Sequence, residues 1–154
     1  MKTADDIVSE KGTEIFSVDC RTPLRNALAL MVSKNVGSVV VTKDLEPVGI
    51  WTSRDLMRNV LANGFDPETR PIEDYVVRRI HSAPHTDTAY ELMDKFLGLR
   101  VNHLLIEKEG RFVGMLSTGD VMKATITEKT KELRKLNTMV SWQYYEEWKW
   151  NPKS

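Results

Sequence analysis

One seven-residue pattern occurs twice in this chain, at residues 49–55 and again at residues 114–120. Each copy has a glycine, two apolar residues, a hydroxyl residue, two variable residues and an aspartate, as GIWTSRD and GMLSTGD. Each copy follows an apolar run and precedes a segment whose apolar residues recur at helical spacing. The hydroxyl and the aspartate are therefore expected where a strand ends and a helix begins, which is a place that suits a small polar ligand.

The same residue types also have a simpler interpretation. A serine or threonine followed three residues later by an acid is an ordinary signature of a helix N-terminus. Thr52 and Ser117 would then be helix caps, and Asp55 and Asp120 would be acids of the first helical turn. Capping alone explains a single copy as well as ligand binding does, whereas the repetition favours a ligand site.

The repetition extends over most of the chain. Residues 15–58 align without a gap with residues 80–123, at an offset of 65 (114 − 49). Residues 6–7 likewise match residues 74–75, with three extra residues in the first copy. A unit of strand, helix, strand, strand and helix cannot cover its own sheet. We therefore predict an α/β (α+β) fold in which two such βαββα units pack sheet to sheet about a pseudo-twofold axis and form two equivalent clefts.

Hydrophobic periodicity and turn residues give approximate bounds for these elements. The first copy is predicted to contain a helical turn at 3–8, a strand at 15–18, a helix from 24 to about 35, strands at 38–42 and 47–52, and a helix at 53–63. Thr22 is expected to cap the first long helix, with Pro23 in its first turn. Three units are predicted, at 3–64, 71–125 and 126–154.

The composition excludes several classes of function. The 154 residues include 22 basic and 22 acidic side chains, so no overall basic field would hold nucleic acid or an anionic membrane. The single cysteine, Cys20, excludes an internal disulfide, and the acidic, polar start does not resemble a signal peptide. No apolar run approaches the ~20 residues of a membrane helix. These features predict a cytoplasmic protein.

From these residues, the chain resembles, over roughly residues 3–125, a tandem pair of cystathionine-β-synthase (CBS) domains, often called a Bateman module. The resemblance implies a non-catalytic regulatory unit, often a homodimer. It also implies a regulatory adenosyl ligand (AMP, ADP, ATP or S-adenosylmethionine) between the repeats, with no required cofactor.

Strand alternation places Ile50 and Thr52 on one face of their strand and Trp51 on the other, where it is expected to pack in the core. An apolar side chain beside a hydroxyl suits a purine next to a ribose or phosphate. A carboxylate at the helix start has two acceptor oxygens and could accept both ribose hydroxyls.

The resemblance assigns roles to both copies. Ile50 and Met115 would contact adenine, Thr52 and Ser117 the ribose or phosphate, and Asp55 and Asp120 the ribose hydroxyls. Each cleft would also borrow residues from the opposite repeat: Val77 and His81 at the Asp55 cleft, and Phe16 at the Asp120 cleft.

The two clefts differ in their expected charge. Arg54 can pair with a phosphate, whereas its counterpart Gly119 offers only backbone. His103, whose counterpart is Ser38, stands where related domains often carry an arginine, so the sequence favours a monophosphate or S-adenosylmethionine over a triphosphate. The alternative is that His103 is a partly buried strand residue without a ligand.

The histidines lack a nearby carboxylate or thiol partner, so no metal site is predicted. Cys20 has no context for a nucleophile, and no enzymatic activity is expected.

Beyond the second repeat, the chain changes character. Apolar residues at helical spacing, among them Ile126 and Leu133, predict an amphipathic helix, and residues 142–150 hold three of the four tryptophans. We expect this aromatic segment to dock on the second subunit of a homodimer. The alternatives are its own CBS pair, another protein or, against the mixed charges, a membrane surface.

Two functions remain open from the sequence. The first is a sensor in which an adenosyl ligand shifts the arrangement of the dimer or of the C-terminal helix and thereby regulates an unknown protein. The second is an interaction or scaffold protein with empty clefts, which recruits a partner through its aromatic tail.

Overall fold

The computed structural model of the chain describes residues 1–134. The aromatic segment 142–150, and with it the predicted docking of the tail, lies outside these described residues. Within residues 1–134, no helix is both long enough and apolar enough to cross a membrane.

Two three-stranded sheets of identical topology form the centre of the molecule. Their strands are β1 (Ser17–Asp19), β2 (Ser38–Lys43) and β3 (Glu46–Thr52) in the first sheet, and β4 (Ser82–Pro84), β5 (His103–Lys108) and β6 (Arg111–Ser117) in the second. In each sheet the middle strand pairs in parallel with the first strand and antiparallel with the third. The predicted duplication is therefore confirmed at the level of strand order and register.

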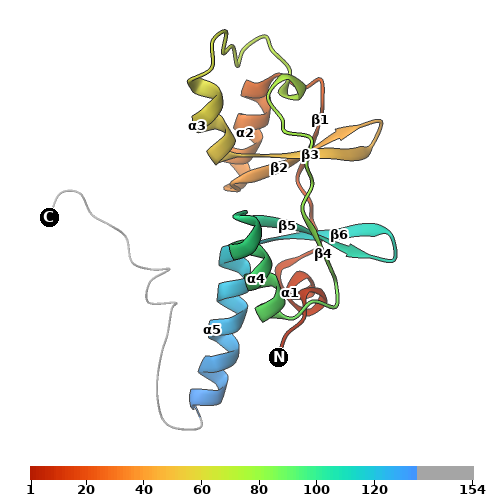
Figure 1. Cartoon of the computed structure of the whole chain (residues 1–154), viewed down its shortest axis with the longest axis vertical. Helices are drawn as coiled ribbons and strands as arrows, with labels where there is room; N and C mark the ends of the chain where they lie inside the picture. Colours follow the sequence, from red (N-terminus) through yellow and green to blue (C-terminus); the bar gives the residue numbers. More distant parts are fainter. Residues whose placement is uncertain (135–154) are drawn as a thin grey trace, which may run out of the picture.

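The helices cover the outer faces of the sheets. They are α2 (Leu24–Lys34) and α3 (Ser53–Val60) on the first sheet, and α1 (Ala4–Lys11), α4 (Ala89–Leu99) and α5 (Thr118–Arg134) on the second. Figure 1 shows the two sheets facing each other between these helices. The residues on either side of Val40 and of Leu105 belong to the two cores beneath the helices. Because side chains alternate along a strand, Val40 and Leu105 lie on the opposite faces of the sheets, and they are buried as well. The predicted sheet-to-sheet packing of an α+β fold is thus confirmed.

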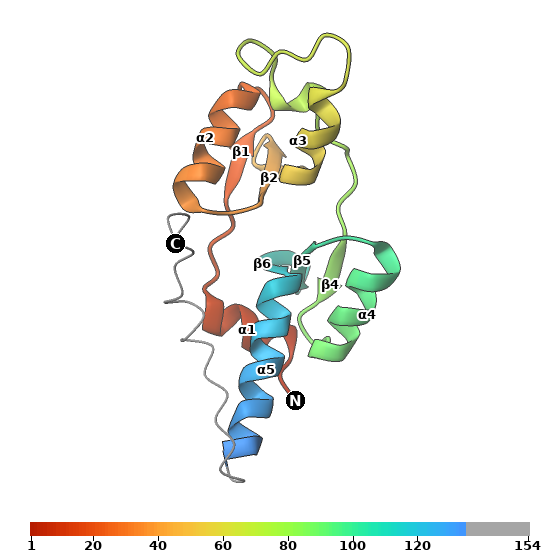
Figure 2. The same cartoon turned by 90° about the vertical axis from the view of Figure 1, so that its left-hand side faces the viewer.

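Each repeat is completed by a segment that precedes the other repeat (Figure 2). Helix α1 precedes the first repeat, but its Ile7 and Val8 lie in the second core, which also contains Leu92 and Leu104. Conversely, Ile72 of the 3₁₀ helix η1 (Ile72–Asp74), which precedes the second repeat, is buried in the first core. The two cores therefore depend on a reciprocal exchange of short segments.

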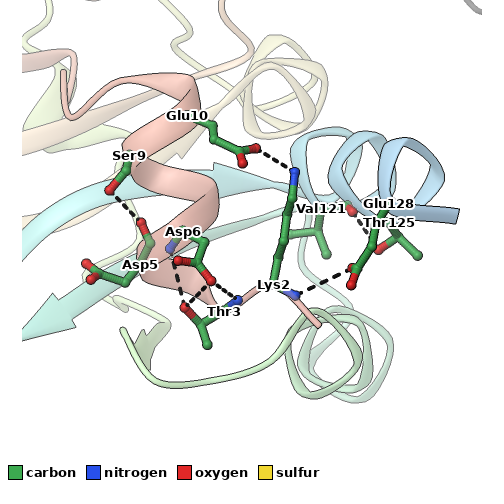
Figure 3. Close-up of polar contacts among 9 residues, drawn as sticks. All are labelled: Lys2, Thr3, Asp5, Asp6, Ser9, Glu10, Val121, Thr125 and Glu128. Carbon is green, nitrogen blue, oxygen red and sulfur yellow. Dashed lines mark hydrogen bonds and ion pairs between the residues drawn. The ribbon is translucent and has the colours of Figure 1, made fainter. Parts of the chain in front are cut away.

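Helix α1 is held at its N-terminus by a capping box (Figure 3). The Thr3 hydroxyl accepts from the Asp6 amide, and Asp6 Oδ2 accepts from the Thr3 amide at 2.9 Å. The Ala4 amide donates to the Asp87 carbonyl oxygen at 2.7 Å, which anchors α1 to the second repeat. Because the orphan amides of the helix are satisfied in this way, an eight-residue helix can form against the second core.

The glycine of each repeated motif is where an exchanged segment crosses a strand. A Cβ on Gly114 would lie 2.7 Å from Val8 Cγ1, and a Cβ on Gly49 would lie 2.8 Å from Val76 Cγ2 and 2.9 Å from the Val77 carbonyl oxygen. Contacts this short are not sustained by real side chains, so both positions need a residue without a Cβ. The repeated glycines are therefore explained by close packing.

Two local expectations were inaccurate. Pro23 is the N-cap residue and Thr22 does not cap, because this stretch pairs with the segment around residue 71 and stays extended until Leu24. Helix α3 ends at Val60 and not at residue 63. The next two amides, of Leu61 and Ala62, donate to carbonyl oxygens three residues earlier, which is the 3₁₀ pattern.

The last helix runs through the predicted boundary between the second repeat and the C-terminal extension. Helix α5 continues from Thr118 to Arg134 across the predicted boundary at residues 125 and 126. No glycine or proline follows Gly119 in this helix, so nothing in its sequence stops it.

The glycine contacts give a prediction about stability. Gly114→Ala should lower the free energy of unfolding by about 1–3 kcal/mol, because the new methyl group overpacks against Val8. In a double-mutant cycle, Val8→Ala should partly rescue it, with a favourable coupling of about 1 kcal/mol or more. Urea denaturation measures each term.

Gly98→Ala is the matched control, because Gly98 lies in α4 with open space around its Cα. It should stabilise the chain slightly. Additive losses in the cycle would show that Val8 does not restrict residue 114.

Candidate ligand-binding site

The hydroxyl and acid of each repeated motif form a helix cap. The Thr52 hydroxyl accepts from the Asp55 amide at 3.3 Å, while Asp55 Oδ2 accepts from the Thr52 amide at 2.9 Å. Ser117 and Asp120 make the equivalent pair of bonds at 3.1 and 2.8 Å. The capping interpretation is therefore observed, and it fixes each carboxylate at the junction of a strand and a helix.

A cavity of about 240 Å³ lies beside the first motif. Its lining comes from the end of β3 and the start of α3, from the connector before β4, and from the turn between α4 and β5. The cavity thus lies between the two repeats. Its residues are Ile50, Thr52, Ser53, Arg54, Asp55, Arg58, Val77, Arg79, His81, Arg100, Val101, Asn102 and His103.

The structure brings together the residues that the sequence assigned to this first cleft. Those in the lining are Ile50, Thr52, Arg54, Asp55, Val77, His81 and His103. The elements of the second repeat contribute its far wall, as the resemblance implied. Their role as ligand contacts stays a prediction.

Sequence reasoning missed three of the four arginines at this cleft, Arg58, Arg79 and Arg100. Arg58 follows Arg54 by one helical turn, a spacing that was visible in the sequence. Arg79 lies 68 residues after Lys11, the same offset as between Asp6 and Asp74 (74 − 6, 79 − 11). Arg100 is the left-handed C-cap of α4 and the counterpart of Asn35, the C-cap of α2, at the offset of 65 (100 − 35), so the repeat alignment could have located this helix end.

Charge at the first cleft is strongly positive. Four arginines surround a single carboxylate, that of Asp55, whose side chain is 17% exposed and lies 3.7 Å from the Arg58 guanidinium. All four arginines line the cavity and are exposed to solvent, and they are called the rim arginines below. This arrangement can attract and pair with an anionic group, because arginine presents several donors in a fixed fork.

His103 lies at the border of the two clefts. Burial lowers the pKa of the His103 imidazole, and the nearby Lys11 ammonium lowers it further, so the ring is neutral near pH 7. A neutral imidazole offers one donor and one acceptor instead of the arginine fork common at this place.

The second copy of the motif, where the sequence predicts the second cleft, is arranged differently. Lys11 Nζ lies 2.7 Å from Asp120 Oδ2 and 2.9 Å from the Met115 carbonyl oxygen. The buried Ser38 hydroxyl lies 3.7 Å from Met115 Sδ, so these two predicted residues touch across the repeats. Phe16 packs against the first core, with the Lys34 ammonium 5.9 Å from its ring centre.

The Asp120 carboxylate is held in its charged form. Burial raises the pKa of Asp120, but hydrogen bonds from Lys11 and from the Ser117 amide together lower the pKa by more. The two motifs are therefore inequivalent: Asp120 is paired with Lys11 of α1, whereas Asp55 borders a cavity and lies 3.7 Å from Arg58 of its own helix.

Other chemistry has little support among residues 1–134. No group of three or more His, Cys, Asp or Glu side chains in this part of the chain is arranged to hold a metal ion. Burial raises the pKa of the Cys20 thiol, which disfavours the thiolate needed for nucleophilic attack.

Known proteins share this architecture. The chain is 29% identical over 152 residues to the mitochondrial CBS domain-containing protein CBSX3 of Arabidopsis thaliana, covering 92% of this chain and 73% of that protein. A crystal structure of a CBS-domain-containing protein from Agrobacterium tumefaciens matches with a TM-score of 0.76 and 29% identity, over 80% of this chain and 99% of that one.

A third match is a CBS domain pair solved in complex with 5′-methylthioadenosine and S-adenosyl-L-methionine. It has a TM-score of 0.71 and covers 83% of this chain and 98% of that one, but at 15% identity it shows the fold alone. The family model described as "CBS domain" matches this chain twice, at residues 4–62 and 72–126. Together with the duplicated sheets and the reciprocal exchange, these matches show that the chain belongs to the CBS domain family, as a tandem pair.

Proposed function

We propose that this chain, a CBS pair and hence a regulatory module, senses a phosphorylated adenosine nucleotide in its first cleft. The observation that carries the proposal is the set of four arginines around one cavity with a single carboxylate, Asp55. The adenosyl class is supported by the CBS fold, because a neighbour of this fold was solved with two adenosyl compounds.

The charge of the cleft favours a nucleotide over S-adenosylmethionine. A phosphate gains charge-assisted hydrogen bonds from Arg54, Arg79 or Arg100, whereas the positive sulfonium of S-adenosylmethionine would be repelled by the same groups. His103 stands where the sequence resemblance leads one to expect an arginine, so that positive charge is missing. The three arginines that sequence reasoning missed supply more positive charge than that single residue would. AMP, ADP and ATP therefore all remain chemically suitable.

The geometry also supports an orientation for the ligand. Ile50 and Val77 give the cavity apolar surface for a purine, and Asp55 stands at the helix start as an acceptor for ribose hydroxyls. The cavity volume of about 240 Å³ is smaller than the ~300 Å³ at the low end of small-molecule pockets. Phosphates would consequently extend to the exposed arginines at the rim.

The remaining parts of the proposal concern the whole protein. It acts without catalysis in the cytoplasm, as a homodimer that transmits ligand binding to an unidentified target. Recruitment of a partner by the aromatic segment 142–150 stays the alternative function, and it concerns residues outside the described part of the chain.

Arg79→Met should weaken ADP binding at least tenfold while changing adenosine binding less than about twofold, because only ADP has phosphates to pair with the guanidinium. Isothermal titration calorimetry with both ligands measures the difference. Arg111→Met is the matched control, since Arg111 is exposed at the start of β6, outside the cavity lining. Equal losses for ADP and adenosine would count against a phosphate at Arg79.

Asp55→Asn should weaken adenosine and ADP to a similar extent, by about tenfold, because hydrogen bonds to a charged acceptor are stronger than those to an amide. Asparagine keeps an oxygen for the cap with Thr52, so thermal unfolding should change little. Unchanged calorimetric affinities for both ligands would show that Asp55 is a helix cap and nothing more.

A homodimer needs a contact surface, and we expect that surface to include the exposed methionines of α3 and α5. Met57 on α3 and its counterpart Met122 on α5 are 71% and 48% exposed, and both helices lie on the same side of the molecule (Figure 1). Changing both to lysine should convert a dimer to a monomer in light scattering, because charge is poorly tolerated at the core of an interface. Leu97→Lys on α4, also exposed, is the control. A dimer that survives the double substitution would place the interface elsewhere.

A further inference from the structure

Lys11 connects helix α1 to the second copy of the repeated motif. It is the last residue of α1, and its ammonium donates to both Asp120 Oδ2 and the Met115 carbonyl oxygen, at 2.7 and 2.9 Å. Both acceptors belong to the motif whose first copy lines the open cavity. One acceptor is a carboxylate oxygen and the other is a backbone carbonyl oxygen of the strand. Without Lys11, both could accept hydrogen bonds from the hydroxyl and amino groups of a ligand.

The repeat alignment shows what stands in place of Lys11 at the first cleft. The offset of 68 that relates Asp6 to Asp74 relates Lys11 to Arg79, so each cation lies at or near the end of an exchanged segment (74 − 6, 79 − 11). Arg79 lines the first cavity, where Asp55 is approached by Arg58 of its own helix at 3.7 Å. Equivalent positions thus carry a rim cation in one cleft and an occupied ion pair in the other.

We infer that Lys11 is an internal occupant of the second cleft, which takes the ligand's place at Asp120 and at the Met115 carbonyl oxygen and so directs the adenosyl ligand to the first cleft. This inference rests on the proposed function, because it specifies which of two related clefts is open. Lys11 acts here as a specificity-determining residue, although it lies outside both copies of the motif.

The chemistry of the second cleft sets the consequence. A ligand that enters must first break a short, charge-assisted hydrogen bond between the Lys11 ammonium and the Asp120 carboxylate. Lys11→Met keeps a long side chain but removes the charge and the donors, which releases both acceptors. Gly119 provides no counterpart to Arg54, so a neutral adenosyl compound suits the released cleft better than a phosphorylated one.

The test is a ¹H–¹⁵N NMR titration of the full chain with adenosine. In the native sequence, the amides of Thr52 and Asp55 should shift saturably, while those of Ser117 and Asp120 should report a dissociation constant at least tenfold weaker. Lys11→Met should tighten binding at the second pair of amides at least tenfold, or about 1.4 kcal/mol. The first pair should change less than twofold.

Two control variants accompany the test. Lys11→Arg keeps the positive charge and the donors, so the second cleft should stay closed. Lys108→Met removes a lysine of nearly the same exposure, 41% against 40%, which pairs with Asp5 at the other end of α1. It should leave both clefts unchanged, because it makes no contact with the second motif.

The outcomes separate this inference from the proposed function. Equal binding at both clefts of the native chain, or no gain at Asp120 in Lys11→Met, overturns the role of Lys11 and leaves the first cleft in place. Absence of shifts at Thr52 and Asp55 with both adenosine and ADP contradicts the proposed function instead.

In that last case, a ¹³C titration of the carboxyl groups still decides about Lys11 without a ligand. The Lys11 hydrogen bond lowers the pKa of Asp120, so Lys11→Met should raise that pKa. A higher pKa supports the occupation of Asp120 by Lys11, and an unchanged pKa overturns it.

Discussion

The reciprocal exchange of short segments between the repeats is the interaction on which the rest of the structure depends. Helix α1 enters the second core through Val8, which lies on Gly114, and the connector after η1 lies on Gly49 of the first repeat. Ile7 and Val8 of α1 are buried in the second core and Ile72 of η1 is buried in the first, so each core includes residues of the segment it receives. The exchange therefore joins the two repeats into one unit, and it explains in physical terms why the repeated motif begins with glycine.

The same exchange places a cation from each segment near the opposite motif. Arg79, in the connector before β4, lines the first cavity, whereas Lys11, the last residue of α1, bonds to Asp120. The same two segments thus contribute to stability and to ligand selection, since each completes the core of one repeat and also carries the cation beside the motif of that repeat. A duplicated framework can in this way support one open cleft and one internally occupied cleft, with only a few differences in side chains.

Much of this architecture could be predicted from the sequence, because duplication makes weak local signals agree with one another. Strand order, the buried Trp51 and the grouping of Val77 with Asp55 were all predictable from pattern or resemblance. The role of Lys11 was not, because a surface lysine at the end of a short helix has no local signature and its partner lies 109 residues away. Arg100 was missed for a similar reason, since its place in the cavity depends on how the second repeat packs beside the first motif. Contacts that form only through the exchange of segments join residues far apart in the sequence, so local patterns do not predict them.

A crystal structure of the full chain grown with saturating ADP would show directly which cleft holds the nucleotide. We expect one nucleotide per chain, with its ribose at Asp55, its phosphates within hydrogen-bond distance of the rim arginines, and Lys11 still bonded to Asp120. Density for the nucleotide at Asp120, with Lys11 displaced and the first cleft empty, would contradict this expectation.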